Sequence, residues 1–210
     1  MKKRMLYGAV SAAMIILILA VSFIWLSTDE KQKVSQELID QFKNCDMGAE
    51  DTWLLYADEK IVIFYDRPAL MVYDIKAKKI IRTLGFEELG VKYLQGDEAY
   101  CIYASTHGDK VMFEQAFQSH RFVYDVKKNT ISKDGDDIDK LFKAENYFNS
   151  YMQYEEIDTI KGFPLQGMGI KVNNEKYVFL TNTSSKFKLE GLEIVAVSSG
   201  TIEAIPVFEK

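Results

Sequence analysis

The feature that most constrains this chain is an uncharged, apolar stretch that runs from Met5 to Leu26. A helix of about 20 apolar residues is long enough to cross the roughly 30 Å hydrocarbon core of a bilayer. The stretch therefore predicts one transmembrane helix over residues 5–26. Because this single span holds no ionisable side chain, transport through it is not expected.

Basic residues precede the apolar stretch and acidic residues follow it. Lys2, Lys3 and Arg4 stand before it, whereas Asp29 and Glu30 come shortly after it. Since basic residues stay on the cytoplasmic side of a single span, we expect residues 1–4 in the cytoplasm and residues 27–210 outside it. The prediction is a single-pass protein of the cell membrane with an extracytoplasmic C-terminal domain.

A cleaved signal peptide is the alternative interpretation of the same stretch. Such a peptide has a shorter apolar core that is followed by small residues at the cleavage site. Ala20–Ser22 would serve as that site, but the apolar run continues through Phe23–Leu26. The continuation favours an uncleaved anchor.

The charge of the remaining chain excludes some classes of partner. Residues 27–210 hold 23 of the 26 basic residues and all 31 acidic ones, which gives a formal charge of −8. Nucleic-acid binding needs clustered Lys and Arg, so a nucleic-acid partner is not expected. The same sign would keep this part of the chain off an anionic lipid surface.

Residues 27–50 connect the predicted anchor to the rest of the chain, and residues 29–44 have a helical pattern. Four apolar residues fall on one stripe of such a helix: Val34, Leu38, Ile39 and Phe42. Early acidic residues and the late Lys43 suit the helix dipole. We predict a short linker helix, with a helical stalk or a dimer contact as the alternative use of the stripe.

Residues 51–210 consist of short runs rich in Val, Ile, Tyr and Phe, separated by turn-forming clusters, which predicts a mainly β extracytoplasmic domain. The predicted strands fall into three sets. The first set is Trp53–Tyr56, Ile61–Tyr65, Leu70–Asp74 and Ile80–Leu84. The second set is Tyr100–Ala104, Val111–Ala116, Phe122–Asp125 and Thr130–Ser132. The third set is Gly169–Val172, Lys176–Thr181, Leu192–Val197 and Thr201–Val207.

A short motif repeats across the sets. Val72–Lys76 (Val-Tyr-Asp-Ile-Lys) aligns with Val123–Lys127 (Val-Tyr-Asp-Val-Lys), and Ile194–Val197 is a degenerate third copy. The second interval is the longer one, and it contains residues 136–158, where apolar residues recur at near-helical spacing. We therefore predict one helix inserted between the second and third sets.

Four-stranded units with Val-Tyr-Asp before a tight turn resemble the blades of bacterial surface β-propellers. The resemblance implies propeller-like four-stranded units, so the whole prediction is a mainly β fold of such units with an inserted helix, after one N-terminal transmembrane helix. Propellers have about four to eight blades, whereas this chain offers three sets. The sets could pack as an open array or sandwich, the helical segment could hide a further blade, or two chains could combine.

Several short elements follow one another in a particular order between residues 53 and 132. They are Val62–Phe64, Val72–Ile75 with Lys79–Arg82, Gln95–Asp97 with Tyr100–Cys101, and Val123–Val126. In this order they resemble the external region of Gram-positive membrane metallopeptidases of the β-lactam-sensing antirepressor type. Because the chain has no H-E-x-x-H motif, the resemblance implies a sensor-like or accessory module without the peptidase. No catalytic residue carries over.

The two histidines offer little for catalysis or metal binding. His107 and His120 lie thirteen residues apart, so they are not a helical pair of metal ligands. We expect His107, before Gly108 and Asp109, in a turn and His120 at a strand end. A Ser/His/Asp triad assembles from distant positions, so the spacing alone leaves it open, although no G-x-S-x-G motif supports it.

Two further patterns are weak. Ser185 and Lys188 fit S-x-x-K, but the companion S-D-N and K-T-G elements are absent, so we expect a polar loop. Acidic residues cluster at Asp134, Asp136, Asp137 and Asp139. An EF-hand needs Gly at its sixth position, which is missing here, so a solvated turn is expected, with a weak calcium site as the alternative. No catalytic, cofactor-binding or metal-binding residue is predicted.

Cys45 and Cys101 are the only cysteines. The predicted topology places both outside the cytoplasm, where disulfides persist. A bridge between them would stabilise the fold by roughly 4 kcal/mol on the chain-entropy model. A Cys45–Cys101 disulfide and two separate thiols both remain open at this point.

These features together predict a membrane-anchored, extracytoplasmic binding or sensory module that is not an enzyme, with the membrane and a further protein as its partners. One alternative is a cell-envelope hydrolase, which would show a cleft that gathers His107 or His120 with a Ser and an Asp. The other is a structural subunit of a membrane complex, which would show an apolar patch on the linker helix or an unpaired sheet edge.

Overall fold

The computed structural model describes residues 34–46, 52–91, 99–115, 121–133, 147–149, 154–157, 167–186, 188–198 and 201–208. The chain divides into two compact units, Met1–Lys31 and Gln32–Lys210, and every described residue belongs to the second unit. The predicted anchor over residues 5–26 lies outside the described residues. No helix among the described residues is long and apolar enough to cross a membrane.

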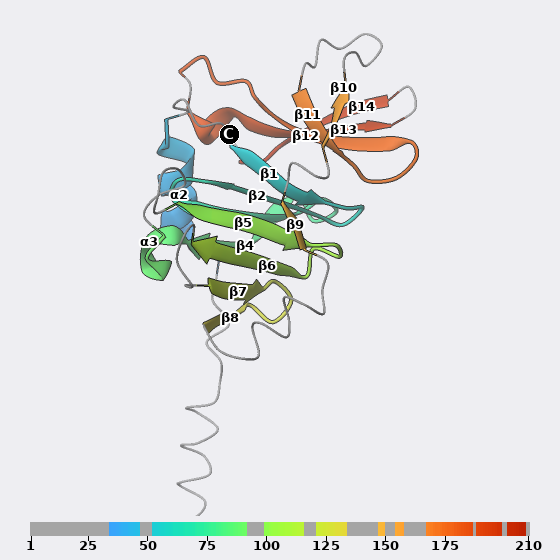
Figure 1. The fold of residues 1–210 in the computed structure, drawn as a ribbon. Coiled ribbons are helices and arrows are strands. Elements are labelled where there is room, and N and C mark those ends of the chain that lie inside the picture. Colours follow the sequence, from blue (N-terminus) through green and yellow to red (C-terminus); the bar gives the residue numbers. More distant parts are fainter. Residues whose placement is uncertain are drawn as a thin grey trace, which may run out of the picture. The chain divides into compact units, whose positions relative to one another are not determined.

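The described chain is mainly β, and the three predicted strand sets form three antiparallel sheets (Figure 1). The first sheet contains β1 (Trp53–Ala57), β2 (Ile61–Asp66), β3 (Ala69–Asp74) and β4 (Lys79–Gly85). The second contains β5 (Tyr100–Ser105), β6 (Lys110–Gln115), β7 (Arg121–Asp125) and β8 (Thr130–Lys133). The third contains β11 (Gly167–Lys171), β12 (Lys176–Asn182), β13 (Leu192–Ser198) and β14 (Thr201–Pro206).

The prediction of a helix over residues 136–158 is wrong for the described part of that segment. Two short strands lie there instead, β9 (Tyr147–Asn149) and β10 (Tyr154–Ile157). β9 pairs with β5, and β10 pairs with β11, so the second and third sheets each gain a fifth strand. The segment is rich in Tyr and Phe, which favour strands, and pairing with a neighbouring sheet edge outweighs its near-helical spacing.

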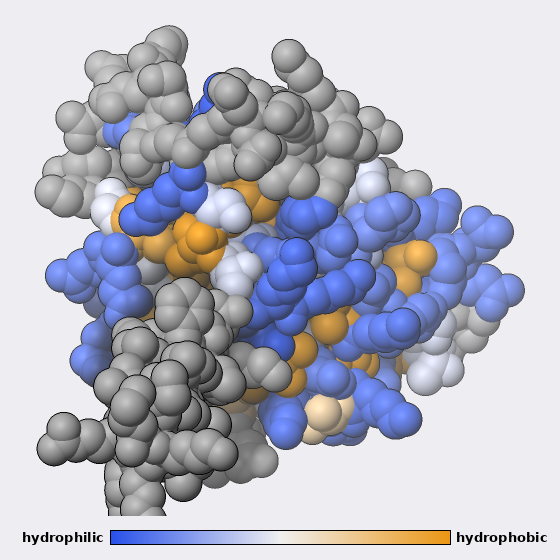
Figure 2. All heavy atoms as spheres, turned by 90° about the horizontal axis from the view of Figure 1, so that it is seen from below, coloured by the Kyte–Doolittle hydropathy of each residue, from blue (hydrophilic) through white to orange (hydrophobic). Residues whose placement is uncertain are grey.

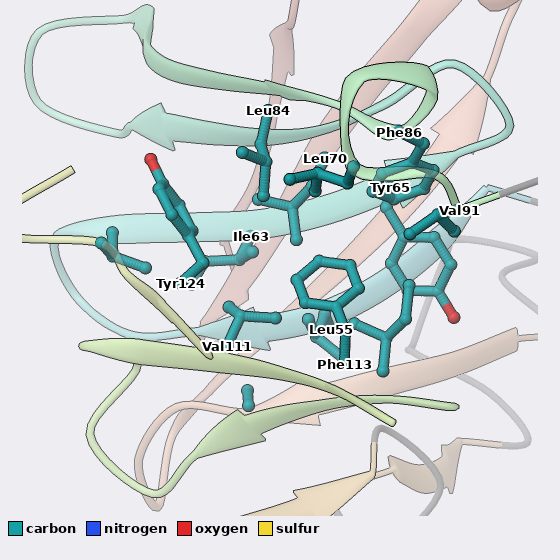
Figure 3. Packing of buried hydrophobic residues seen from close by; sticks show 14 of the residues in the cluster. Leu55, Ile63, Tyr65, Leu70, Leu84, Phe86, Val91, Val111, Phe113 and Tyr124 are labelled. Carbon is teal, nitrogen blue, oxygen red and sulfur yellow. The ribbon is translucent and has the colours of Figure 1, made fainter. Parts of the chain in front are cut away.

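The first sheet is buried on both faces, because it packs on the second sheet on one side and on the third sheet on the other. The cluster shared with the second sheet includes Leu55, Ile63, Leu70, Val111 and Phe113 (Figure 3). The cluster shared with the third sheet includes Val62, Phe64, Met71, Val178 and Ile194. Successive residues of β2 therefore enter different cores, which explains why its sequence is continuously apolar.

Aromatic rings fill the core between the first two sheets. The Phe113 and Phe122 rings stack with their centroids 4.4 Å apart, and Phe86 meets the Phe113 ring edge-on at 5.9 Å. Phe86 comes from α3 (Phe86–Leu89), a short helix directly after β4. Such ring pairs add to the apolar area that is removed from water.

The predicted linker helix is present as α2 (Gln36–Asn44), shorter than residues 29–44. Ser35 caps it, because its hydroxyl accepts a hydrogen bond from the Leu38 N–H. Phe42 is fully buried and packs against Phe64 of β2 and Phe208. The apolar stripe of the helix thus packs on the core that the first and third sheets share.

The sequence repeat corresponds to a repeated turn. Asp74 accepts a hydrogen bond from the Ala77 N–H after β3, and Asp125 accepts one from the Lys128 N–H after β7. Lys78 and Asn129, one residue further on in each turn, both have positive φ values. The Val-Tyr-Asp motif therefore ends a strand and fixes the four-residue turn that follows.

The three sheets do not close into a propeller. On the outer face of the second sheet, Met112 and Val123 form one cluster, and on the outer face of the third sheet, Phe179, Val195 and Val197 form a separate one. Closure would require these two faces to meet. Seen from below (Figure 2), most of the coloured surface is hydrophilic, with hydrophobic atoms in small areas between.

Candidate functional site

A surface pocket with a volume of about 440 Å³ lies between α2, the β2–β3 turn and α3. It combines residues from three segments that are distant in the sequence. Its lining comprises Ser35, Glu37, Leu38 and Gln41 from the α2 region, Arg67 and Pro68 from the turn, and Gly85, Glu87, Glu88 and Val91 from the end of β4 onward. A volume of several hundred Å³ is typical of sites for small ligands.

One wall of the pocket is the first half of α2. The Ser35 N–H donates to Thr83 Oγ1 over 2.9 Å, which holds the start of the helix against β4. Leu38 packs over Gly85, where a Cβ atom would lie only 3.2 Å from Leu38 Cδ2. Glycine at this position therefore allows the close approach of helix and strand.

The β2–β3 turn also lines the pocket, and a buried carboxylate holds this turn in place. Asp66 accepts a hydrogen bond from the Arg67 N–H over 2.6 Å and another from the Thr52 hydroxyl over 3.0 Å. The Phe86 N–H donates to Pro68 O over 3.0 Å and thereby ties α3 to the same turn. Gly90, at φ +75°, ends α3 and directs the chain to Val91.

The chemistry of the lining suits binding. Glu37, Glu87 and Glu88 bring exposed carboxylates to the lining, and Arg67 brings one guanidinium. Leu38, Pro68 and Val91 supply apolar surface, so the lining combines apolar contacts with a few polar groups. No motif marks these residues in the sequence, because the pocket exists only once the three segments meet.

The β5–β6 turn brings Ser105, His107 and Asp109 together, but not as a catalytic triad. The Ser105 hydroxyl donates to Asp109 Oδ1 over 2.8 Å and accepts the Lys110 N–H over 3.1 Å. Ser105 is 1% exposed, whereas His107 is exposed at the tip of the turn, as predicted. A nucleophilic serine needs its hydroxyl bonded to a base such as histidine. The Ser105 hydroxyl is bonded to Asp109 instead, so its role is to stabilise the turn.

The same turn shows how its acidic residue is stabilised. Burial alone would raise the pKa of Asp109, but the Ser105 hydroxyl and the nearby Lys110 and Lys127 together lower it. Gly108, at φ +63°, lies against the Tyr56 ring, where a Cβ atom would be 2.2 Å from Cε1. The turn is thus locked onto β1 of the first sheet.

Ser185 and Lys188 do not form a serine–lysine pair. Ser185 is exposed in a turn. The Lys188 ammonium binds the Asp46 carboxylate over 2.6 Å and the Asn44 carbonyl over 2.9 Å, at the C-terminal end of α2. Its contacts hold the third sheet to the helix.

Cys45 and Cys101 are both free cysteines in the structure. Cys45 follows α2 and packs on the core between the first and third sheets, whereas Cys101 is exposed on β5 of the second sheet. Burial, followed by the charge of Asp66, raises the pKa of the Cys45 thiol, which disfavours the reactive thiolate.

The remaining predicted candidates are His120 and the acidic residues Asp134, Asp136, Asp137 and Asp139, and they lie outside the described residues. In the part of the chain that is described, no three His, Cys, Asp or Glu side chains gather as metal ligands. No protein family, curated protein or solved structure matches the chain.

Proposed function

We propose that the chain is a membrane-anchored, extracytoplasmic binding or sensory module without catalytic activity, which takes its ligand in the pocket between α2 and α3. The observation that carries this proposal is the pocket itself. Its walls are held by the Ser35–Thr83 and Phe86–Pro68 hydrogen bonds, so it is formed before a ligand arrives. Preformed pockets bind with less ordering cost.

The proposals of a membrane anchor and of a sensory role rest on the sequence. The apolar stretch over residues 5–26 supports attachment to the cell membrane, with the domain outside. The likeness of residues 53–132 to the external region of antirepressor-type metallopeptidases supports a sensory role. β1 contacts β5 and β11, the first strands of the other two predicted sets, and these contacts support the proposal of propeller-like units that do not close.

A structural subunit of a membrane complex is the second candidate function. The specific observation in its favour is β14, an edge strand of the third sheet with exposed residues at Thr201–Ala204. The linker helix gives no such support, because its apolar stripe is packed on the core. The turn that holds Ser105, His107 and Asp109 gives no support to the alternative of a hydrolase, because the Ser105 hydroxyl is bonded to Asp109 and not to a histidine.

Two glutamines on α2 provide a matched test of the pocket. Gln41 lines the pocket, whereas Gln36 does not, and both are exposed. A photo-reactive amino acid at position 41 of the intact anchored protein should form a discrete adduct in its native membranes, and the same residue at position 36 should not. Gln41→Trp should fill the pocket and block the ligand, while Gln36→Trp should leave binding unchanged.

Two results would overturn the proposal. Equal adducts at positions 36 and 41, or none at either, would remove the pocket as the binding site. Hydrolysis of purified cell-envelope material by the protein, abolished by His107→Ala, would replace the binding module with an enzyme.

A further inference from the structure

β14 offers an open sheet edge whose outer half is exposed on both faces. Among the strands that the structure describes, it pairs with β13 alone. Thr201 to Ala204 are exposed, and the Ile202 side chain is 36% exposed, although Ile205 at the other end is buried. An exposed edge is a template for an additional strand.

The hydrogen-bond phase shows which backbone groups face outward. Beyond the strand end, the Val207 N–H donates to Leu192 O over 3.0 Å, so every second pair along the hairpin exchanges hydrogen bonds with β13. Ile202, Ala204 and Pro206 fall in the other pairs, and their backbone groups point away from β13. The Tyr73 hydroxyl agrees with this phase, because it donates to Pro206 O from outside the hairpin over 3.4 Å.

A second copy of the chain fits this edge poorly. If Ile202 of one copy paired with Ala204 of the other, the two Glu203 side chains would lie directly opposite, and like charges in that position destabilise a sheet. In the next register Ile202 would face Pro206, which has no N–H to donate. The two antiparallel registers that overlap most are therefore unfavourable for a second copy, so a different chain suits this edge better.

We propose that the β14 edge binds an extended segment of another protein, which adds as a sixth strand and places a basic residue opposite Glu203. Glu203 is well exposed and has only a loose contact of 3.7 Å with Lys78, so it can accept a second cation. On the other face, Ile202 and Ala204 extend the apolar row of Val197 and Val195, to which they are paired. The fitting segment alternates basic and apolar residues. This edge is independent of the α2–α3 pocket.

The probe is an acetylated, amidated heptapeptide of alternating Val and Lys, added to the full chain in nanodiscs of neutral lipid. Ala204→Pro removes one outward N–H without touching the β13 ladder, as the native Pro206 does in the same phase. The variant should weaken peptide binding about tenfold, because that change in affinity corresponds to the net free energy of one backbone hydrogen bond. The control variant Ala204→Val keeps both the N–H and the charge, so it should bind the peptide like the native chain. A control peptide of alternating Val and Glu should not bind, because it places an acidic residue opposite Glu203.

Hydrogen exchange tests the edge without any variant. The Ile202 and Ala204 amides should exchange rapidly in the free protein and slowly with saturating peptide. Equal peptide affinity of Ala204→Pro and the native chain, or rapid exchange of both amides in the complex, would overturn the proposal. Gln41→Trp should not change peptide binding, so the edge and the pocket can fail separately.

Discussion

Lys78 and Asn129 occupy equivalent positions in the two copies of the repeated turn, with φ values of 51° and 60°. Asn tolerates this left-handed conformation better than Lys. Asn129 is also buried, and its side-chain oxygen accepts a hydrogen bond from the buried Tyr124 hydroxyl. The residue at this position of the turn is therefore packed in the interior after β7, whereas its equivalent after β3 is exposed to solvent.

We expect Asn129→Ala to lower the free energy of unfolding by about 2–4 kcal/mol, because it leaves a buried hydroxyl without this acceptor and strains the backbone. Lys78→Ala, the matched control, should lower it by less than about 1 kcal/mol. Urea denaturation measures both. Equal losses would show that the hydrogen bond contributes nothing.

At the scale of elements, α2 is the clearest case of a helix stabilised by tertiary packing. It is only nine residues long, which is too short for a helix to be stable alone in water. The centroid of its Phe42 ring lies 5.8 Å from that of Phe64 and 6.1 Å from that of Phe208. Phe42 is the residue that enters the core.

Phe42→Ala should therefore lower the free energy of unfolding by about 3–5 kcal/mol through the lost contacts and the cavity left behind. Val34→Ala is the control, since Val34 precedes the helix and is 38% exposed, and its effect should stay within about 0.5 kcal/mol. Thermal unfolding by circular dichroism compares them. A small loss for Phe42→Ala would mean that the helix docks loosely.

The strands and turns could be predicted from residues because their signals are local. Asp74 and Asp125 mark turns through their own side chains, and the apolar runs of β2 and β3 mark strands. The sequence predicts a helix over residues 136–158 because aromatic residues fit both periods, whereas the pairing of β9 with β5 and of β10 with β11 is a long-range contact. The pocket depends on three distant segments, so no local signal announces Arg67 or Gln41.

At the scale of the whole molecule, tyrosines in two sheets titrate late. Burial raises the pKa values of Tyr56 and Tyr124 to about 12. At Tyr103, burial and the neighbouring Cys101 and Glu114 together raise the pKa to about 12. Asp58 adds to the effect at Tyr56, to which it is hydrogen-bonded. The unfolded chain ionises its tyrosines near pH 10. The neutral form is therefore favoured by the folded state.

A folded-state pKa above the unfolded value contributes stability below about pH 10 and loses it as the pH rises toward 12. We expect the free energy of unfolding to fall over that range, with part of the tyrosine absorbance at 295 nm appearing only above pH 11. Tyr124→Phe should flatten the fall, although it also removes the Asn129 hydrogen bond. Full ionisation of all twelve tyrosines near pH 10 in a folded protein would contradict this prediction.

The middle position of the first sheet has a consequence for biosynthesis. This sheet is complete at Gly85, but one of its faces is covered mainly by the second sheet, and the other by α2 and by residues up to Phe208. Chains grow at about 5–20 residues per second, so the second face waits roughly 6–25 seconds for its cover. During that interval the part of this apolar face that α2 does not cover stays exposed to solvent, where a chaperone can protect it.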